Sequence, residues 1–283
     1  MLGHELLQSY SNSHDVRVTL RNDLKDYPEN RLFTVNNTFA GVDVSSIDRL
    51  ESVLRGFSPD AVINAVGIIK QREDASSYVP CIEINALLPH KLSALCKKTD
   101  SRLIHISTDC VFSGKKGNYN EEDFADANDL YGRSKFLGEV NDNHCITLRT
   151  SIIGLELRHK KSLIEWFLSQ SGEINGFQKA IYSGLTTMEM ARVIEHLLVN
   201  HPDLSGIYHL ASTPISKYEL LSLLARLLKR NDIVIKPDDK FVCDRSLDAS
   251  RFMRDTGYIA PAWDIMLKEL ADRIISRDKG ITT

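Results

Sequence analysis

The chain has 283 residues, of which 42% are hydrophobic and 26% charged, and its formal net charge at neutral pH is −3. This length allows one large domain or two unequal domains with substantial cores. The near-balanced charge does not indicate a nucleic-acid or anionic membrane partner, and the apolar runs are too short to cross a membrane.

In the first half of the chain, β-rich runs alternate with helical patterns. We predict strands at 15–20, 39–44, 60–67, 102–108 and 145–154, and helices at 47–57, at 78–99 and from about residue 130 past 140. Ser46 is a candidate N-cap for the first of these helices, and Pro89 is a candidate kink in the second. Strands separated by helices indicate an α/β fold with a doubly wound, Rossmann-like parallel sheet.

After Gly154 this alternation breaks down. The predicted helices are 162–171, 187–200, 218–230 and 263–275, and the predicted strands are 206–211 and 233–237. We therefore expect a dinucleotide-binding domain over residues 1–154. A smaller, mixed α/β substrate-binding portion is expected over residues 155–283, some of whose elements can return to the sheet.

The chain opens with a helical pattern, MLGHELLQSY, instead of a strand. Nucleotide-binding α/β units normally begin with a strand, a glycine-rich turn and a helix whose N-terminus holds the pyrophosphate. Gly3 matches the last glycine of such a turn, whereas the first strand and the earlier glycines are missing. One interpretation is that this helix starts the fold. The other, which we favour, is a truncated sequence, which would leave a central strand position open.

The cysteines and histidines show no pattern of ligation or pairing. The five cysteines are Cys81, Cys96, Cys110, Cys145 and Cys243, an odd number without a C-x-x-C pair. They predict reduced thiols in a cytoplasmic protein. The nine histidines include no H-E-x-x-H or similar spacing, so we expect no protein-bound metal.

The segment YGRSK places Tyr131 and Lys135 four residues apart. On a helix these two side chains share one face, and the ammonium then favours the ionised phenol and lowers its pKa from about 10. A phenol of this kind is a general acid or base near neutral pH. The spacing is common on amphipathic helices, so the surrounding motifs decide its meaning.

Five segments together resemble the extended short-chain dehydrogenase/reductase family, and within it the dTDP-4-dehydrorhamnose reductase group. They are MLG, DAVINAVG, HISTDCVFSG, YGRSK and LRTSIIG. The most specific part is the S-T-D-x-V-F-x-G run followed by Y-x-x-S-K, and the resemblance extends from Met1 to the helix at Trp263. Such reductases transfer a hydride from a nicotinamide to the C4 ketone of a nucleotide-linked 6-deoxy sugar. The resemblance implies this activity, in the synthesis of surface polysaccharide precursors.

The resemblance also implies the catalytic residues. Tyr131 corresponds to the proton donor, and Lys135 lowers its pKa and contacts the nicotinamide ribose. Thr108 corresponds to the hydroxyl that orients the substrate carbonyl, and Asp109 is a further expected substrate contact. Ser107 is the alternative hydroxyl, on the opposite face of the strand. Thr108 is preferred because the family's hydroxyl stands immediately before the aspartate.

Other positions match the family's cofactor contacts. They are Gly3 at the first helix, Asp43 and Val44 near the adenine, Ala65, Val66 and Gly67 beside the dinucleotide, and Thr150 and Ser151 on the nicotinamide side, together with Tyr131 and Lys135. An NAD enzyme usually has an acid at the end of the second strand, for the ribose 2′-hydroxyl. This chain has Arg21 there, which suits a 2′-phosphate. We therefore predict NADPH, with NADH as the alternative cofactor.

Basic residues of the second portion are candidates for the diphosphate of a nucleotide-linked sugar. They are Arg158, Lys160, Lys161 and Arg245. Arg245 is preferred because RSLDASR resembles the stretch that approaches the nucleotide in extended family members. The sequence leaves the sugar and the nucleotide open, and it allows a homodimer.

Two alternative functions remain open. Dehydratases on this fold follow the threonine with an Asp-Glu pair, and here Cys110 follows Asp109, which argues against dehydration but not against epimerisation. The family also includes a reductase-like subunit that regulates methionine adenosyltransferase. The missing glycine turn favours such a non-catalytic subunit, whereas the intact Thr108, Tyr131 and Lys135 favour an enzyme.

Overall fold

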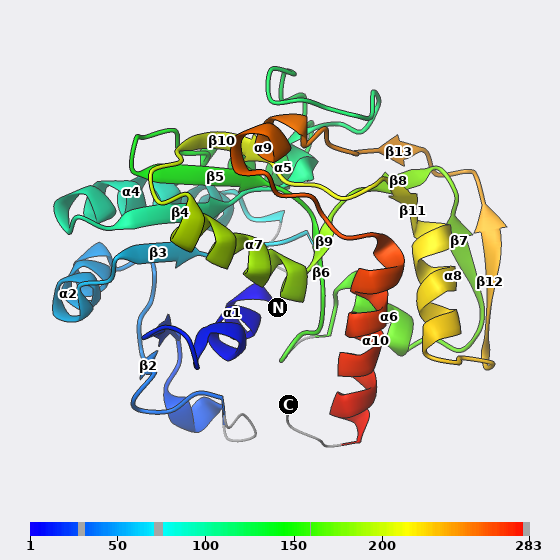
Figure 1. The fold of residues 1–283 in the computed structure, drawn as a ribbon, viewed down its shortest axis with the longest axis horizontal. Helices are drawn as coiled ribbons and strands as arrows, with labels where there is room; N and C mark the ends of the chain where they lie inside the picture. The colour runs from blue at the N-terminus through cyan, green and yellow to red at the C-terminus, as the bar shows by residue number, and fades with distance from the viewer. Residues whose placement is uncertain (28–31, 71–75, 159, 280–283) are drawn as a thin grey trace. The chain divides into compact units, whose positions relative to one another are not determined.

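The computed structural model describes residues 1–27, 32–70, 76–158 and 160–279 (Figure 1). The chain forms two compact units and passes between them several times. Unit 1 comprises Met1–Ser107, Asp129–Leu148 and Ile194–Ile207, and unit 2 comprises Thr108–Asn128, Arg149–Val193 and Tyr208–Thr283. The compact units therefore interleave along the sequence, and neither has a single boundary at residue 154.

Parallel strands form the framework of unit 1. Four strands are hydrogen-bonded in the order β10 (Gly206–His209), β5 (Cys145–Arg149), β4 (Arg102–Ile106) and β3 (Ala61–Asn64). β1 (Val18–Thr19) and β2 (Thr38–Phe39) pair with each other in a separate parallel sheet. The expected α/β class with a parallel sheet is confirmed. Within the described residues, β1 and β3 each have one hydrogen-bonded strand neighbour, so the sheet is in two parts.

Helices pack their apolar faces on these strands. α1 spans Leu2–Tyr10 and α2 spans Ile47–Phe57, with Ser46 at the predicted N-cap position although its side chain makes no capping hydrogen bond. In α2 the buried side chains Leu50, Val53 and Leu54 follow helical spacing. They pack with apolar residues of α4, β4 and β5 into one core cluster.

The helix predicted over 78–99 consists of three segments. α3 (Tyr78–Cys81) leads into a π-helical turn (Ile82–Leu87), and α4 (Leu88–Lys98) follows. Pro89 has no N–H to donate to the carbonyl of Asn85, four residues earlier, which accounts for the widened turn directly before it. The predicted irregularity at Pro89 is therefore a change of helix type.

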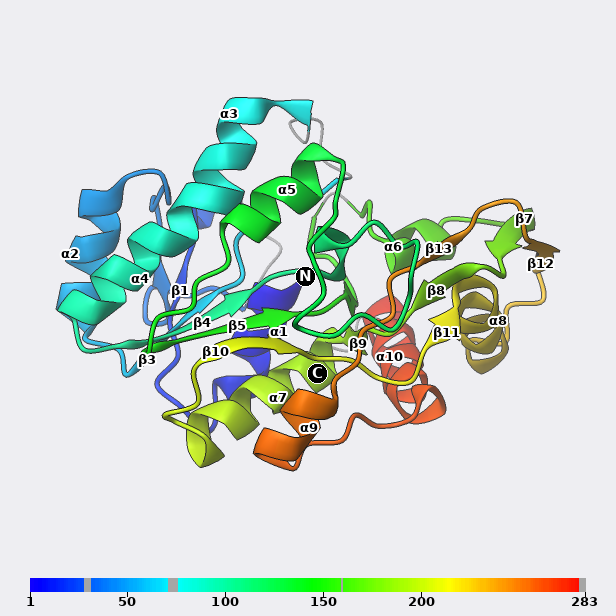
Figure 2. The same ribbon diagram turned by 90° about the horizontal axis from the view of Figure 1, so that it is seen from above.

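α5 spans Leu130–Leu137 and packs beside the π-helical turn and α3 (Figure 2). The prediction that this helix continues past Val140 was wrong, because it ends at its C-cap, Gly138. A Cβ atom on Gly138 would lie 1.9 Å from the Asn85 carbonyl oxygen. The glycine thus permits a close approach to the π-helical turn and also ends the helix.

Unit 2 contains short strands and helices. β7 (Gly172–Phe177) pairs in parallel with β12 (Ile233–Asp238), and β8 (Ala180–Tyr182) lies between β11 (Ile215–Ser216) and β13 (Cys243–Asp244). α8 (Lys217–Leu227) packs on β7 and β12, and α10 (Trp263–Asp278) packs beside α8 (Figure 1). The other elements are η4 (Asp109–Val111), β6 (Ile152–Ile153), α6 (Leu163–Leu168), β9 (Leu185–Thr186) and α9 (Ser250–Thr256), with η1 (Leu24–Asp26) in unit 1.

α7 (Thr187–Asn200) begins in unit 2 and ends in unit 1. The predicted helices 187–200, 218–230 and 263–275 correspond to α7, α8 and α10. None of the helices in the described part of the chain is both long and apolar enough to span a bilayer.

Candidate functional site

The predicted site residues are divided between the two units. Unit 1 carries Gly3, Arg21, Asp43, Val44, Ala65, Val66, Gly67, Tyr131 and Lys135, and unit 2 carries Thr108, Asp109, Thr150, Ser151 and Arg245. The two groups come from several separate chain segments, and in each unit some of their members are in direct contact.

In unit 1, Tyr131 and Lys135 lie on α5, as the spacing predicted. Asp129 caps this helix by accepting a hydrogen bond from the Gly132 N–H at 2.9 Å, and Lys70 donates to the same carboxylate at 2.7 Å. The Lys70 ammonium lies 5.6 Å from the centroid of the Tyr131 ring. Lys70 thus places a cation beside the tyrosine, and it was not among the predicted site residues.

Lys135 is almost completely buried, with 4% of its surface exposed. Its Nζ donates a hydrogen bond of 2.7 Å to the Ile106 carbonyl at the end of β4. Burial lowers the pKa of Lys135 to about 8, and the Glu139 charge partly opposes this effect. An amine with such a pKa exchanges protons readily near neutral pH.

Ser107 directs its hydroxyl to Glu139, which accepts a hydrogen bond at 2.8 Å. This contact lies within unit 1 and gives Ser107 a structural role. It leaves Thr108 as the hydroxyl for the predicted substrate contact, and that assignment stays a prediction.

His105 lies on β4 and is fully buried next to Lys135. Its pKa is well below the usual value, mainly because burial disfavours the charged ring and also because Lys135 is close. Its Nδ1 pairs with the Asn64 amide nitrogen at 3.1 Å, and its Nε2 has no hydrogen-bond partner among the described residues. This neutral histidine was not among the predicted site residues.

Asn85 fixes the segment after β3, where Ala65, Val66 and Gly67 were predicted to approach the dinucleotide. Its side chain accepts from the Ile68 N–H at 2.8 Å and donates to the Ile68 carbonyl at 3.0 Å. Ala65 and Val66 are exposed, with 41% exposure for Val66. Hydrogen bonds with Asn85 thus fix the backbone of this segment, while Ala65 and Val66 remain accessible to a ligand. Asn85 was not among the predicted site residues, because the π-helical turn that carries it was not predicted.

Two predicted cofactor residues, Arg21 and Asp43, form an ion pair of 3.2 Å between Nε and Oδ2. The Arg21 side chain is 75% exposed. Hydrogen bonds from Ser45, from its backbone N–H first and then its hydroxyl, hold the pKa of Asp43 below its usual value, and Arg21 adds to this.

Gly3 and Val44 gain less support as cofactor contacts. A Cβ on Gly3 would meet no atom within 4 Å among the described residues, so packing does not require this glycine. Val44 is only partly buried and packs against the core cluster around α2 and α4. Both assignments stay predictions.

In unit 2, the structure brings Thr108, Asp109 and Thr150 together. The Thr108 hydroxyl accepts from the Cys110 N–H at 3.1 Å and donates to the Asp109 carboxylate at 3.2 Å. The Asp109 N–H donates to the Thr150 carbonyl at 3.3 Å, and the Thr150 hydroxyl donates to the Ser151 carbonyl at 3.3 Å. Thr108 and Asp109 are each 6% exposed. The buried Thr108, Asp109 and Thr150, with the partly buried Ser151, thus form one polar cluster.

Arg245 donates a hydrogen bond of 2.8 Å from Nε to the Phe112 carbonyl. The segment around it packs closely on the loop after Phe112. Gly114, the glycine of the VFSG motif, has a positive φ angle, and a Cβ on it would lie 2.5 Å from the Cys243 sulfur. The backbone conformation and the close packing at Gly114 therefore require a glycine at this position of the VFSG motif. A diphosphate contact by Arg245 stays a prediction.

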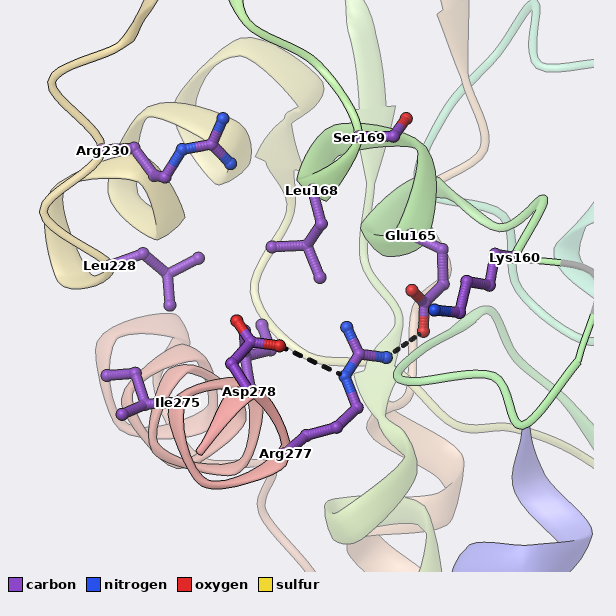
Figure 3. A pocket seen from close by; sticks show the side chains of 10 residues that line it. Lys160, Glu165, Leu168, Ser169, Leu228, Arg230, Ile275, Arg277 and Asp278 are labelled. Carbon is purple, nitrogen blue, oxygen red and sulfur yellow. Dashed lines mark hydrogen bonds and ion pairs between the residues drawn. The ribbon is translucent and has the colours of Figure 1, made fainter. Parts of the chain in front are cut away.

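A pocket of about 360 Å³ lies in unit 2 between α6, α10 and the end of α8 (Figure 3). Of the four basic residues proposed for the diphosphate, Lys160 lines it and Arg245 does not. Its two arginines are already paired: Arg277 donates to Glu165 at 2.5 Å, and Arg230 donates to Asp232 at 2.6 Å. These paired charges do not favour this pocket as a diphosphate site.

Asp142, His144 and Cys145 are of metal-ligating types and lie within 4.8 Å of one another. Ser93 already contacts all three: it donates to Asp142 at 2.5 Å and lies 3.2 Å from His144 and 3.3 Å from the Cys145 sulfur. The hydrogen bonds give this cluster a structural explanation, and the absence of a metal stays a prediction.

The model of the family described as "RmlD substrate binding domain" matches residues 1–273. The dTDP-4-dehydrorhamnose reductase of Aggregatibacter actinomycetemcomitans is 27% identical over 192 residues, which cover 64% of this chain and 65% of that protein. Methionine adenosyltransferase 2 subunit beta of Danio rerio is 28% identical over 194 residues, which cover 63% of this chain and 58% of that protein. The chain thus spans less than two thirds of each relative.

The crystal structure of a hypothetical dTDP-4-dehydrorhamnose reductase from Sulfolobus tokodaii has the same fold. The TM-score is 0.74 at 27% sequence identity, and the match covers 93% of this chain and 94% of that one.

Proposed function

Because the chain belongs to the RmlD substrate-binding domain family, we propose that it is a reductase of nucleotide-linked sugars. The proposed reaction is the NADPH-dependent reduction of the C4 ketone of a 4-keto-6-deoxy sugar, in the synthesis of surface polysaccharide precursors. The observation that carries the proposal is the Tyr131–Lys135 pair on α5, with a buried Lys135 whose pKa is about 8. The relative from Aggregatibacter actinomycetemcomitans, itself named as such a reductase, supports it.

In this reaction Tyr131 gives its phenolic proton to the oxygen of the ketone as the carbon becomes tetrahedral. A bound dihydronicotinamide supplies the hydride. Lys135 holds positive charge next to the phenolate that remains and can return a proton to it, since its pKa is close to neutral pH. When substrate binds, the Thr108 hydroxyl turns its proton from Asp109 Oδ1 to the substrate carbonyl and so orients it, and Asp109 contacts the sugar.

Arg21 carries the preference for NADPH. Its guanidinium is exposed and is held by an exposed ion pair with Asp43, which is worth less than about 1 kcal/mol. A 2′-phosphate can therefore recruit the guanidinium at little cost, through a charge-assisted hydrogen bond. The exposed Ala65 and Val66 in the same unit suit the close approach of a dinucleotide.

A second candidate function is a non-catalytic subunit. The relative named methionine adenosyltransferase 2 subunit beta favours it. The burial of Lys135 argues for an enzyme, because a buried ammonium is costly to the fold and is retained where it has a chemical task. An epimerase would use the same phenol without net oxidation of the cofactor.

NADPH oxidation in the presence of a panel of nucleotide-linked 4-keto-6-deoxy sugars tests the proposal. Turnover is expected with at least one sugar, and Tyr131→Phe should lower kcat by about 10²–10⁴-fold, the usual worth of general acid catalysis. Tyr78→Phe is the matched control, because Tyr78 is 69% exposed. No oxidation with any sugar would support the non-catalytic subunit, and product without oxidation would support an epimerase.

The cofactor assignment has its own test. Arg21→Ala should raise the KM for NADPH by about tenfold or more and leave the KM for NADH unchanged, because only NADPH has the 2′-phosphate. Arg49→Ala, a change at an exposed arginine of α2, is the control. Equal use of both cofactors by the unaltered protein would contradict the role of Arg21.

A further inference from the structure

Tyr182, at the end of β8, has a buried hydroxyl without a hydrogen-bond partner in the described part of the chain. Its ring packs on Trp263, with 5.5 Å between the ring centroids. A buried donor without an acceptor destabilises a folded protein, and such groups are rare unless a ligand completes them. The residue was not among the predicted site residues.

The surroundings of this hydroxyl connect it to the polar cluster of unit 2. A Cβ on Gly184 would lie 2.3 Å from the Tyr182 hydroxyl and 2.1 Å from the Ser151 carbonyl oxygen. Gly184 therefore makes room for the hydroxyl next to Ser151, which belongs to the cluster. Burial and the nearby Asp109 charge both raise the pKa of Tyr182, so its phenol is neutral and a donor.

Asp109 supplies the complementary group. Its carboxylate is 6% exposed and accepts a hydrogen bond on Oδ1 from Thr108. Within the described residues Oδ2 receives none. Tyr182 thus offers a proton and Asp109 offers lone pairs, and no hydrogen bond joins them. A ligand hydroxyl fits such a pair, because it can donate to one partner and accept from the other.

We propose that Asp109 and Tyr182 form a subsite for one hydroxyl of the substrate sugar. The hydroxyl donates to Asp109 Oδ2 and accepts from the Tyr182 hydroxyl. This inference rests on the proposed function, in which Thr108 contacts the C4 ketone. Asp109 directly follows Thr108, so the hydroxyl on C3, next to the ketone, is the one assigned to the subsite. The substrate class is thereby narrowed to sugars that keep this hydroxyl.

The test compares a nucleotide-linked 4-keto-6-deoxy sugar with its 3-deoxy counterpart. The unaltered protein should prefer the hydroxylated sugar by at least about tenfold in kcat/KM, because the 3-deoxy sugar leaves buried polar groups unpaired. Tyr182→Phe should lose most of this preference, mainly through a higher KM for the hydroxylated sugar. Tyr208→Phe, in the same unit, removes a hydroxyl that is bonded to Asp255 and should keep the preference.

Two further readouts make the outcome decisive. Tyr182→Phe removes a hydroxyl without a partner, so its thermal unfolding temperature should equal or exceed that of the unaltered protein. A clear fall in that temperature, an unchanged preference, or a higher KM for NADPH alone would each overturn the subsite. Absence of turnover by the unaltered protein with either sugar would instead reject the proposed function, and the subsite with it.

Discussion

The substitution Lys135→Met tests the burial of the Lys135 ammonium. In the folded protein its pKa falls from 10.5 to about 8, chiefly because burial disfavours the charge. The unfolded chain therefore binds one more proton than the folded chain between about pH 8 and pH 10.5. Stability consequently rises with pH across this window, and the full cost of the buried charge is present below it. The pKa change corresponds to about 3 kcal/mol.

The assay is urea unfolding of both proteins at a series of pH values. The free energy of unfolding of the unaltered protein, relative to Lys135→Met, should rise by about 3 kcal/mol between pH 7 and pH 10.5, because the variant lacks this titration. Other groups titrate in both proteins and cancel. Lys91→Met, at an exposed lysine of α4, should show no such dependence. A constant difference for Lys135→Met would refute the depressed pKa and with it the proton exchange proposed for Lys135.

Three further predictions concern the rest of the fold. Gly138→Ala should lower the free energy of unfolding in urea by about 1–3 kcal/mol, because its Cβ would lie 1.9 Å from the Asn85 carbonyl oxygen. The control is Gly56→Ala in α2, whose Cβ would have no atom within 4 Å among the described residues and which should stabilise the protein by up to about 1 kcal/mol. Burial lowers the pKa of His209 to about 4. The free energy of unfolding, relative to that of His209→Gln, should therefore fall by about 3 kcal/mol as the pH drops from 6.5 to 4. A constant difference between the two proteins would contradict the lowered pKa. A thiol reagent should label the partly exposed Cys110 and Cys243 of the native protein before the buried Cys81, Cys96 and Cys145, and mass spectrometry of digests measures the order. Burial raises the pKa of Cys96 to about 12, so early labelling of Cys96 would contradict its burial.

The regular elements were predictable because their patterns are local. The strand predicted at 102–108 corresponds to β4 and the helix predicted at 47–57 corresponds to α2, with Ser46 at its N-cap position. Both have continuous apolar or helical periodicity over their whole length. The short strands of unit 2, such as β8 and β13, were not predicted. They have three and two residues, too few for a period, and their pairing joins segments about 60 residues apart.

The end of α5 shows why boundaries were harder. Glycine after Leu137 is a common signal for a helix end, yet the helix was predicted to continue past residue 140. What ends α5 is the approach of Gly138 to Asn85, whose carbonyl is left without its helical donor by Pro89. Three residues from two distant segments thus set one boundary.

In the candidate site, likewise, relations between residues close in sequence were predictable, and contacts between distant segments were not. Spacing alone placed Tyr131 and Lys135 on one helix. It could not show that Lys135 would donate to Ile106, or that His105 would be its neighbour. These contacts require β4 to lie under α5, and they have a chemical consequence. A protonated His105 would add a second positive charge to a site that already disfavours one. Burial and Lys135 keep it neutral, so that the lysine is the group that titrates near neutral pH.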